Sequence, residues 1–255
     1  MTDPVRYRAR LAYVGTFFHG WQRQRNAART VQAVLEKALE TLDGADVRAH
    51  AAGRTDAGVH ADGQVAHFDL SRRREPARLR DGANALLPWD LRVLEVEAVR
   101  PEFHARRDAV WKEYLYRWSR APVVPPRDAL FVAPISPRAD AARMREAARD
   151  LPGERDFGVF GAGRPAGESS VRRLQFVRIE EDAEEIHALF RGDAFLRGMI
   201  RSIAGTLADV GRGKAPAGRA AELLASQDRR LLSPKAPASG LTLLRVHYRR
   251  EPSRE

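Results

Sequence analysis

The residues best suited to chemistry lie in one short polar segment, Gly53-Arg-Thr-Asp-Ala-Gly-Val-His-Ala61, between two predicted strands. Asp56 lies at its tip with Arg54 two residues before it, and the glycines allow a tight turn or a close approach to a ligand. An aspartate in a turn most often accepts a local backbone N–H, and spacing alone favours that structural role. A carboxylate kept ionised by a neighbouring guanidinium can instead act as a nucleophile or a base.

A second candidate is an aromatic stripe on a predicted strand, formed by Lys112, Tyr114, Tyr116 and Trp118. These residues alternate along the chain, so they project from one face of the strand. Aromatic side chains near basic residues commonly stack on single-stranded bases, but a sheet face buried under a helix has the same pattern. We expect burial for most of the stripe, and both roles stay open for Tyr114.

Two arginines flank the apolar face of a predicted helix over Ala194–Val210. At about 100° per residue, Arg197 and Arg201 fall outside the arc of apolar side chains. They either face solvent or line a cleft and meet an anion, and the sequence favours neither. The side chains expected to be buried on this helix are Phe195, Met199, Ile200, Ile203, Leu207 and Val210.

Several kinds of chemistry are excluded or disfavoured. The absence of cysteine excludes a disulfide framework, a thiol nucleophile, an iron–sulfur cluster and a thiolate zinc site. The phosphate-loop pattern GxxxxGK[ST] and the zinc pattern HExxH are also absent from the sequence. One group has residue types suited to a metal, but at most two of its members share a strand face: His60, Asp62, His67 and Asp69. The sequence therefore predicts no metal site.

The charge of the chain points to a polyanionic partner. The 255 residues include 44 Lys and Arg against 34 Asp and Glu, a net charge of +10. Such a basic excess most often serves nucleic-acid binding, although an inert basic surface is the alternative. A hydrophobic content of 44% supports a packed core. No segment approaches the roughly 18 apolar residues of a membrane span, so we expect a soluble cytoplasmic protein.

The elements that must position these residues alternate in type along the chain. The sequence predicts an α+β fold of two similar halves, each a mostly antiparallel sheet with helices packed on one face, and an active-site cleft between them. The expected bounds are 1–103 and 104–249, with a flexible tail over 250–255. Strands are predicted over Arg6–Val14, Val47–Ala52, Gln64–Leu70, Arg92–Val99, Ala109–Trp118, Leu174–Glu180, Glu185–Phe190 and Leu241–Arg249, and helices over Thr30–Gly44, Asp140–Leu151, Ala194–Val210 and Ala217–Ser226.

Segments spread along almost the whole chain resemble motifs of the TruA-type tRNA pseudouridine synthases. The segment 53–61 is similar to the signature of that family. The other similar segments, in order, are Tyr13-Val-Gly-Thr-Phe-Phe-His-Gly-Trp-Gln-Arg-Gln24, Thr30-Val-Gln, Asn84-Ala-Leu-Leu-Pro88, Phe103-His-Ala-Arg106, Tyr114-Leu-Tyr116, Asp156-Phe157, Ser170-Val-Arg172, Phe195-Leu-Arg-Gly-Met-Ile-Arg201 and Gly240-Leu-Thr-Leu. The resemblance, and not the spacing, favours a catalytic Asp56.

The resemblance implies an isomerase that converts uridine to pseudouridine at positions 38, 39 and 40 of the tRNA anticodon stem-loop, without cofactor or metal. It implies that Asp56 is the nucleophile and that Arg54 assists base flipping by filling the vacated space. It further implies that Tyr114 stacks on the flipped uracil and that Arg201 pairs with the catalytic aspartate. Members of the family are homodimers that cradle one tRNA.

Two alternatives from other classes remain. A catalytically silent RNA-binding or chaperone protein on the same fold would share the charge and the aromatic stripe but would not need Asp56. A metal-dependent nuclease would use Asp56, Asp62 and Asp69, and activity that survives EDTA would exclude it.

Overall fold

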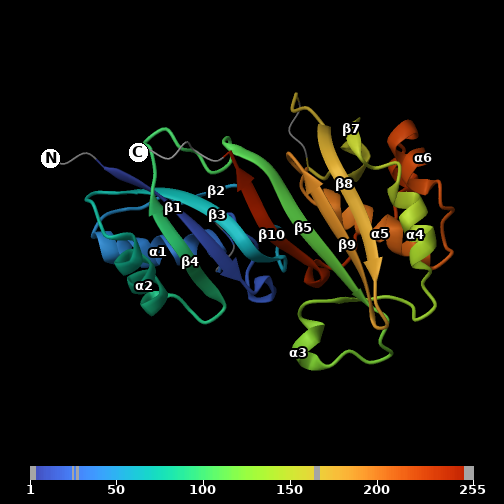
Figure 1. The fold of residues 1–255 in the computed structure, drawn as a ribbon, viewed down its shortest axis with the longest axis horizontal. Helices are drawn as coiled ribbons and strands as arrows, with labels where there is room; N and C mark the ends of the chain where they lie inside the picture. The colour runs from blue at the N-terminus through green and yellow to red at the C-terminus, as the bar shows by residue number, and fades with distance from the viewer. Residues whose placement is uncertain (1–3, 25, 27–28, 164–166, 250–255) are drawn as a thin grey trace. The chain divides into compact units, whose positions relative to one another are not determined.

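The computed structural model of the chain describes residues 4–24, 26, 29–163 and 167–249 (Figure 1). The described residues form two compact units, one within 1–110 and 243–255 and the other within 111–242. The predicted halves 1–103 and 104–249 have different bounds, because most of the C-terminal strand β10 (Leu241–Tyr248) belongs to the first unit. The predicted tail 250–255 lies outside the described residues. Within the described ranges, no helix is long and apolar enough to cross a membrane.

The sheet of the first unit is built around β1 (Val5–Tyr13). This strand pairs antiparallel with both β3 (His60–Leu70) and β4 (Leu91–Ala98), and the strand order is β4-β1-β3-β10. One face of β1 enters the core, with these side chains buried: Tyr7, Ala9, Leu11 and Tyr13. The arginines between them form ion pairs on the other face: Arg6 with Asp69, Arg8 with Glu97 and Arg10 with Glu95. The alternation predicted for this strand is therefore confirmed.

Helices α1 (Val31–Asp43) and α2 (Pro76–Leu86) pack together, with α2 against β4 (Figure 1). The helix predicted over Thr30–Gly44 is confirmed, with these two residues as its caps. The Thr30 hydroxyl accepts the Ala33 N–H at the start of the helix, and Gly44 closes it with φ +79°. The predicted strand Val47–Ala52 is shorter than expected, because only β2 (His50–Ala51) pairs with β3.

The elements that follow β4 in the chain are β5 (Ala109–Ser119), α3 (Pro126–Ala129), β6 (Ala133–Pro134), α4 (Ala141–Ala148), β7 (Gly153–Asp156), β8 (Val171–Glu181), β9 (Glu185–Gly192), α5 (Met199–Gly211) and α6 (Arg219–Ser226). The sheet of the second unit has the order β5-β9-β8-β7, and all of these neighbours are antiparallel. Helix α4 packs on β8 and contacts α5 and α6, so the helices gather beside the sheet (Figure 1). The predicted α+β class with mostly antiparallel strands is confirmed.

Helix α5 begins five positions later than the apolar pattern predicts. Gly198 has φ +70°, a left-handed conformation that a continuous helix does not accommodate, so the helix starts at Met199. Phe195 consequently lies before the helix and is half-buried, not part of its buried face. The other expected core positions are buried as predicted: Met199, Ile200, Ile203, Leu207 and Val210.

His67 on β3 makes the stability of the first unit depend on pH. Its side chain is buried, and Nδ1 accepts the Ala105 N–H at 3.1 Å, which requires an unprotonated nitrogen. Burial, together with the charges of His104, His50 and Arg6, lowers the pKa of His67 from 6.5 to about 4. Because the folded pKa lies below the unfolded one, the unfolded chain binds the proton more readily between these values.

The contribution of neutral His67 to the free energy of unfolding is therefore complete above about pH 6.5 and is expected to decline as the pH falls toward 4. Between pH 7 and pH 5 we expect the free energy of unfolding to fall by about 2 kcal/mol through this residue. Urea unfolding of the wild type and of His67→Asn at both pH values measures the effect, since the Asn carbonyl can accept the same N–H but does not titrate. An equal decrease in the free energy of unfolding in the two proteins would show that His67 is not the group responsible.

Candidate active site

The loop between β2 and β3 carries two of the predicted site residues. Arg54 is exposed and Asp56 is half-buried, whereas Thr55 between them is buried. The backbone turns directly after Asp56, where the Val59 N–H donates to the Asp56 carbonyl at 3.2 Å and Gly58 has φ +81°. The loop therefore fixes Thr55 in the interior and leaves the flanking guanidinium and carboxylate accessible to solvent.

A buried hydrogen-bond network supports this loop from the sheet side. The Tyr13 hydroxyl lies 2.9 Å from Thr55 Oγ1. Gln64 Nε2 donates to Tyr13 Oη at 3.3 Å and to the Gly53 carbonyl at 2.8 Å. Burial raises the pKa of Tyr13 to about 12, so the phenol stays neutral. Both the start and the middle of the loop are thus tied to β1 and β3.

A second loop, residues 15–22, packs against the first. The Trp21 N–H donates to the Thr55 carbonyl at 3.1 Å, and the Gly58 N–H donates to the Phe18 carbonyl at 3.3 Å. Gly20 has φ +82°, and a Cβ at this position would lie only 2.7 Å from the Thr55 carbonyl oxygen. Glycine is therefore required here both for the backbone conformation and for the close approach.

Helix α1 positions this second loop through its first N–H groups. The Val31 N–H donates to the Gly20 carbonyl at 3.1 Å, and the Gln32 N–H donates to the Trp21 carbonyl at 3.0 Å. The first N–H groups of a helix have no partner within the helix, so they are available for such contacts. Helix α1 therefore holds the 15–22 loop, and this loop in turn holds the backbone on either side of Asp56.

An ion pair not singled out in the sequence fixes the same loop. Arg29 donates to both carboxylate oxygens of Asp90, at 2.8 and 2.7 Å, and to the Phe17 carbonyl at 3.1 Å. Its guanidinium also lies over the Phe18 ring, 4.3 Å from the centroid. The hydrogen bonds that Arg29 donates to the Asp90 carboxylate raise the pKa of Arg29, and Asp90 itself is buried. No local spacing signals this contact, because its partners lie 61 residues apart.

Tyr114 lies on β5 in the second unit. Its ring is buried and meets the Phe195 ring edge-on, with centroids 5.1 Å apart. Tyr116 and Trp118 are fully buried, so the prediction of a mostly buried stripe is confirmed. The base-stacking role of Tyr114 stays a prediction.

Arg201 lies in the first turn of α5 and is half-buried. Its Nε donates to the Ala236 carbonyl at 2.9 Å, while the Ala236 N–H donates to the Arg201 carbonyl at 3.0 Å. Arg197, in the turn before the helix, is exposed. Asp56 and Arg54 thus share one loop of the first unit, and Tyr114 and Arg201 belong to the second; a common cleft for all four stays a prediction.

Comparison with known proteins gives these loops a family context. The family described as tRNA pseudouridine synthase matches residues 9–108 and 147–249. These ranges include Arg54, Asp56 and Arg201, whereas Tyr114 lies between them. The chain belongs to the tRNA pseudouridine synthase family. That membership makes it an isomerase acting on tRNA, as the resemblance of its motifs implied.

Relatives of this family align with nearly the whole chain. The tRNA pseudouridine synthase A of Listeria innocua is 41% identical over 247 residues, covering 96% of this chain and 99% of that protein. The protein of the same name from Paramagnetospirillum magneticum is 42% identical, covering 95% of both chains. That from Solidesulfovibrio magneticus is 44% identical over 250 residues, covering 96% of this chain and 91% of that protein.

Asp69, one of the three carboxylates of the nuclease alternative, pairs with an arginine of β1. Asp69 accepts two hydrogen bonds from Arg6, both of 2.7 Å, and these hold the pKa of Asp69 below its ordinary value. Among the described residues, no group of three His, Asp or Glu side chains is arranged to hold a metal ion. Asp69 therefore has a structural partner in Arg6, which makes a shared site with Asp56 unsupported.

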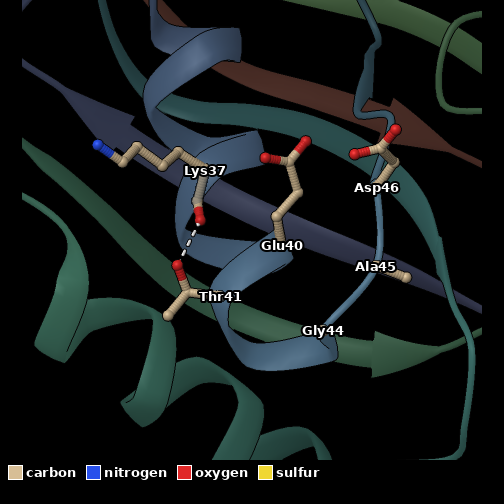
Figure 2. A pocket seen from close by; sticks show the side chains of 6 residues that line it. All are labelled: Lys37, Glu40, Thr41, Gly44, Ala45 and Asp46. Atoms are coloured by element: carbon tan, nitrogen blue, oxygen red, sulfur yellow. Dashed lines mark hydrogen bonds between the residues drawn. The ribbon is translucent and has the colours of Figure 1, made fainter.

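A surface hollow at the C-terminal end of α1 contains none of the predicted site residues (Figure 2). The Thr41 hydroxyl donates to the Lys37 carbonyl at 2.9 Å within the last turns of the helix. The residues that line the hollow are Lys37, Glu40, Thr41, Gly44, Ala45 and Asp46. The hollow therefore does not coincide with the candidate active site.

Proposed function

We propose that this protein isomerises uridine to pseudouridine at positions 38, 39 and 40 of the tRNA anticodon stem-loop, with Asp56 as the nucleophile. The observation that carries the proposal is the loop of Asp56 itself. In a chain of the synthase family, this loop presents an accessible carboxylate on a backbone held by Trp21, Phe18 and the Tyr13–Thr55–Gln64 network. A preorganised carboxylate of this kind is suited to covalent catalysis.

The reaction needs no oxidant, reductant or co-substrate, because the product is an isomer of the substrate. The Asp56 carboxylate adds to the sugar C1′ or to the uracil ring, and the bond between C1′ and N1 breaks. The detached uracil rotates, C5 bonds to C1′, and the carboxylate leaves. C5 loses its proton and N1 gains one, so atoms and charge balance.

The other three residues serve the base that must leave its stack. Extrusion of a paired or stacked base costs a few kcal/mol. Arg54, exposed beside Asp56, fills the vacated space, and Tyr114 stacks on the extruded uracil with its ring braced by Phe195. Arg201 pairs with Asp56, which keeps the carboxylate ionised and oriented.

The charge of the chain suits the partner. A net charge of +10 supports binding to tRNA phosphates, which supplies affinity and register. We further propose that the protein acts in the cytoplasm as a homodimer that cradles one tRNA. Selection of several uridines without a common sequence then rests on the shape and flexibility of the tRNA.

Mapping of the product tests the proposal. We expect purified protein in EDTA to form pseudouridine at positions 38–40 of an unmodified tRNA transcript that carries uridines there, read at single-nucleotide resolution. A matched transcript with cytidine at the three positions is the control and should acquire none. Tight binding without isomerisation on several tRNAs would contradict the proposal and favour the RNA-binding alternative.

A further inference from the structure

Two large aromatic side chains of the first unit are exposed and touch each other. Trp89 is 68% exposed and Phe17 is 45% exposed, and their rings meet edge-on with centroids 5.7 Å apart. The other tryptophan of this unit, Trp21, is almost fully buried. Exposed aromatic area of this kind is unfavourable in water, so a paired patch of it indicates a binding surface.

Short-range contacts hold both aromatic residues in place. Phe17 ends the 3-10 turn Gly15–Phe17, and its carbonyl accepts from Arg29 at 3.1 Å. Trp89 lies in the turn between α2 and β4, where Arg92 donates to the carbonyls of Pro88 and of Leu91, the latter at 2.8 Å. The pair is therefore presented on two braced turns, which lowers the entropy lost when a ligand binds.

The 3-10 turn Gly15–Phe17 connects this aromatic pair to the loop of Asp56. The Phe18 carbonyl, next in the chain to Phe17, accepts the Gly58 N–H at 3.3 Å. Gly15 at the other end of the turn donates its N–H to His60 Nδ1 at 3.1 Å. Phe17 thus points outward from the turn that packs directly on the catalytic loop.

The charge around the pair is complementary to RNA. Arg29 has 34% of its side chain exposed, whereas its partner Asp90 has only 2% exposed, so the cation and not the anion faces solvent. The hydrogen bonds described for Arg92 go to carbonyl oxygens. An exposed indole ring beside two half-buried guanidinium groups combines the two features that bind unpaired nucleotides, stacking and phosphate attraction.

We propose that Phe17 and Trp89 form a stacking platform for an unpaired base of the tRNA substrate, outside the uridine that reacts. The inference rests on the proposed function, because it takes tRNA as the ligand. The platform gives the enzyme a second hold on the RNA next to the catalytic loop. It contributes to affinity and register and takes no part in bond making.

Variants at position 89 test the platform against an anticodon stem-loop RNA with an unpaired loop. We expect Trp89→Ala to weaken binding at least about fivefold, the lower end of the contribution of one stacked base. Trp89→Phe, which keeps a ring, should recover most of the affinity, whereas Trp89→Leu, which keeps apolar area alone, should not. Val123→Ala removes an apolar side chain that is 82% exposed in the other unit and is the matched control without effect.

Acrylamide quenching of tryptophan fluorescence supplies an independent reading, since Trp89 is far more exposed than Trp21 or Trp118. Addition of the RNA should reduce acrylamide quenching of the wild type, whereas it should leave the quenching of Trp89→Ala nearly unchanged. Unaltered affinity of Trp89→Ala would overturn the inference. So would loss of self-association in that variant at unchanged affinity per chain, which would make the pair an interface between two copies.

The two proposals fail in different ways. If the wild type forms no pseudouridine on any tRNA, the proposed function fails, whatever the variants bind. If the wild type is active and Trp89→Ala has the same RNA affinity and the same KM as the wild type, only the platform proposal fails. If Phe17 and Trp89 bind the RNA as proposed, Trp89→Ala should raise KM and leave kcat close to the wild-type value.

Discussion

Replacement of Asp56 by alanine is expected to abolish pseudouridine formation, with a loss of at least about 10⁴-fold in kcat. Among residues 54–58, all of which the structure describes, Asp56 alone combines exposure to solvent with a group that can add covalently to the substrate and leave again, since the Thr55 hydroxyl is buried. The loop should keep its shape, because the contacts on either side of position 56 use backbone atoms that alanine retains: the Thr55 carbonyl with Trp21 and the Asp56 carbonyl with Val59. Affinity for tRNA is therefore expected to stay within roughly 1 kcal/mol of the wild type.

A matched control for this variant is Asp62→Asn. Asp62 is an exposed carboxylate at the start of β3, six positions along the chain, and the proposed mechanism gives it no role. Its substitution should leave both kcat and tRNA affinity unchanged, whereas a nuclease that used it would lose activity. Appreciable turnover by Asp56→Ala in EDTA would show that another group is the nucleophile.

Gly15→Ala is expected to cost about 2–3 kcal/mol of unfolding free energy and to reduce kcat on the order of 100-fold. A Cβ at this position would lie 2.0 Å from the Val59 carbonyl oxygen and 2.3 Å from its carbon. Both atoms belong to the backbone, so no side chain can move aside. Either the turn before Phe18 or the loop that carries Asp56 must shift, and a shift of about 1 Å is enough to misplace a reacting group.

Urea unfolding and single-turnover kinetics of Gly15→Ala measure these two effects separately. Gly218→Ala is the control, because no atom lies within 4 Å of a Cβ built there and its φ of −73° suits alanine. That control should match the wild type in single-turnover kinetics and lose at most about 1 kcal/mol of unfolding free energy, because alanine is a poorer N-cap than glycine at the start of α6. Wild-type stability and activity in Gly15→Ala would contradict the close packing of the two loops.

The parts of the fold that local physics determines could be predicted from the sequence. Alternation of polar and apolar residues gave β1, and the Thr30 cap with Gly44 gave both ends of α1. Helix α2 was missed because few of its side chains are buried, among them Leu79 and Ala83, which leaves a weak apolar periodicity. The start of α5 was misplaced because apolar residues continue before Gly198, and its left-handed φ cannot be read from periodicity.

For the candidate site, the motif around Asp56 could be recognised, but its supports could not. Tyr13 and Thr55 lie 42 residues apart, and Arg29 and Asp90 lie 61 apart, so the two contacts arise only from the pairing of strands and the packing of loops. The exposed Phe17–Trp89 pair is non-local in the same way. Burial of Tyr116 and Trp118 followed from strand alternation, whereas the contact of Tyr114 with Phe195 did not.

One measurement tests the central claim most directly: pseudouridine formed in a single turnover, with protein in excess over an unmodified tRNA transcript and EDTA present throughout. Excess protein saturates the RNA, so differences in affinity do not enter the comparison of wild type with Asp56→Ala. The account predicts pseudouridine at positions 38–40 with the wild type and none with the variant, while both bind the transcript. Equal product from the two proteins, or none from either, would contradict it.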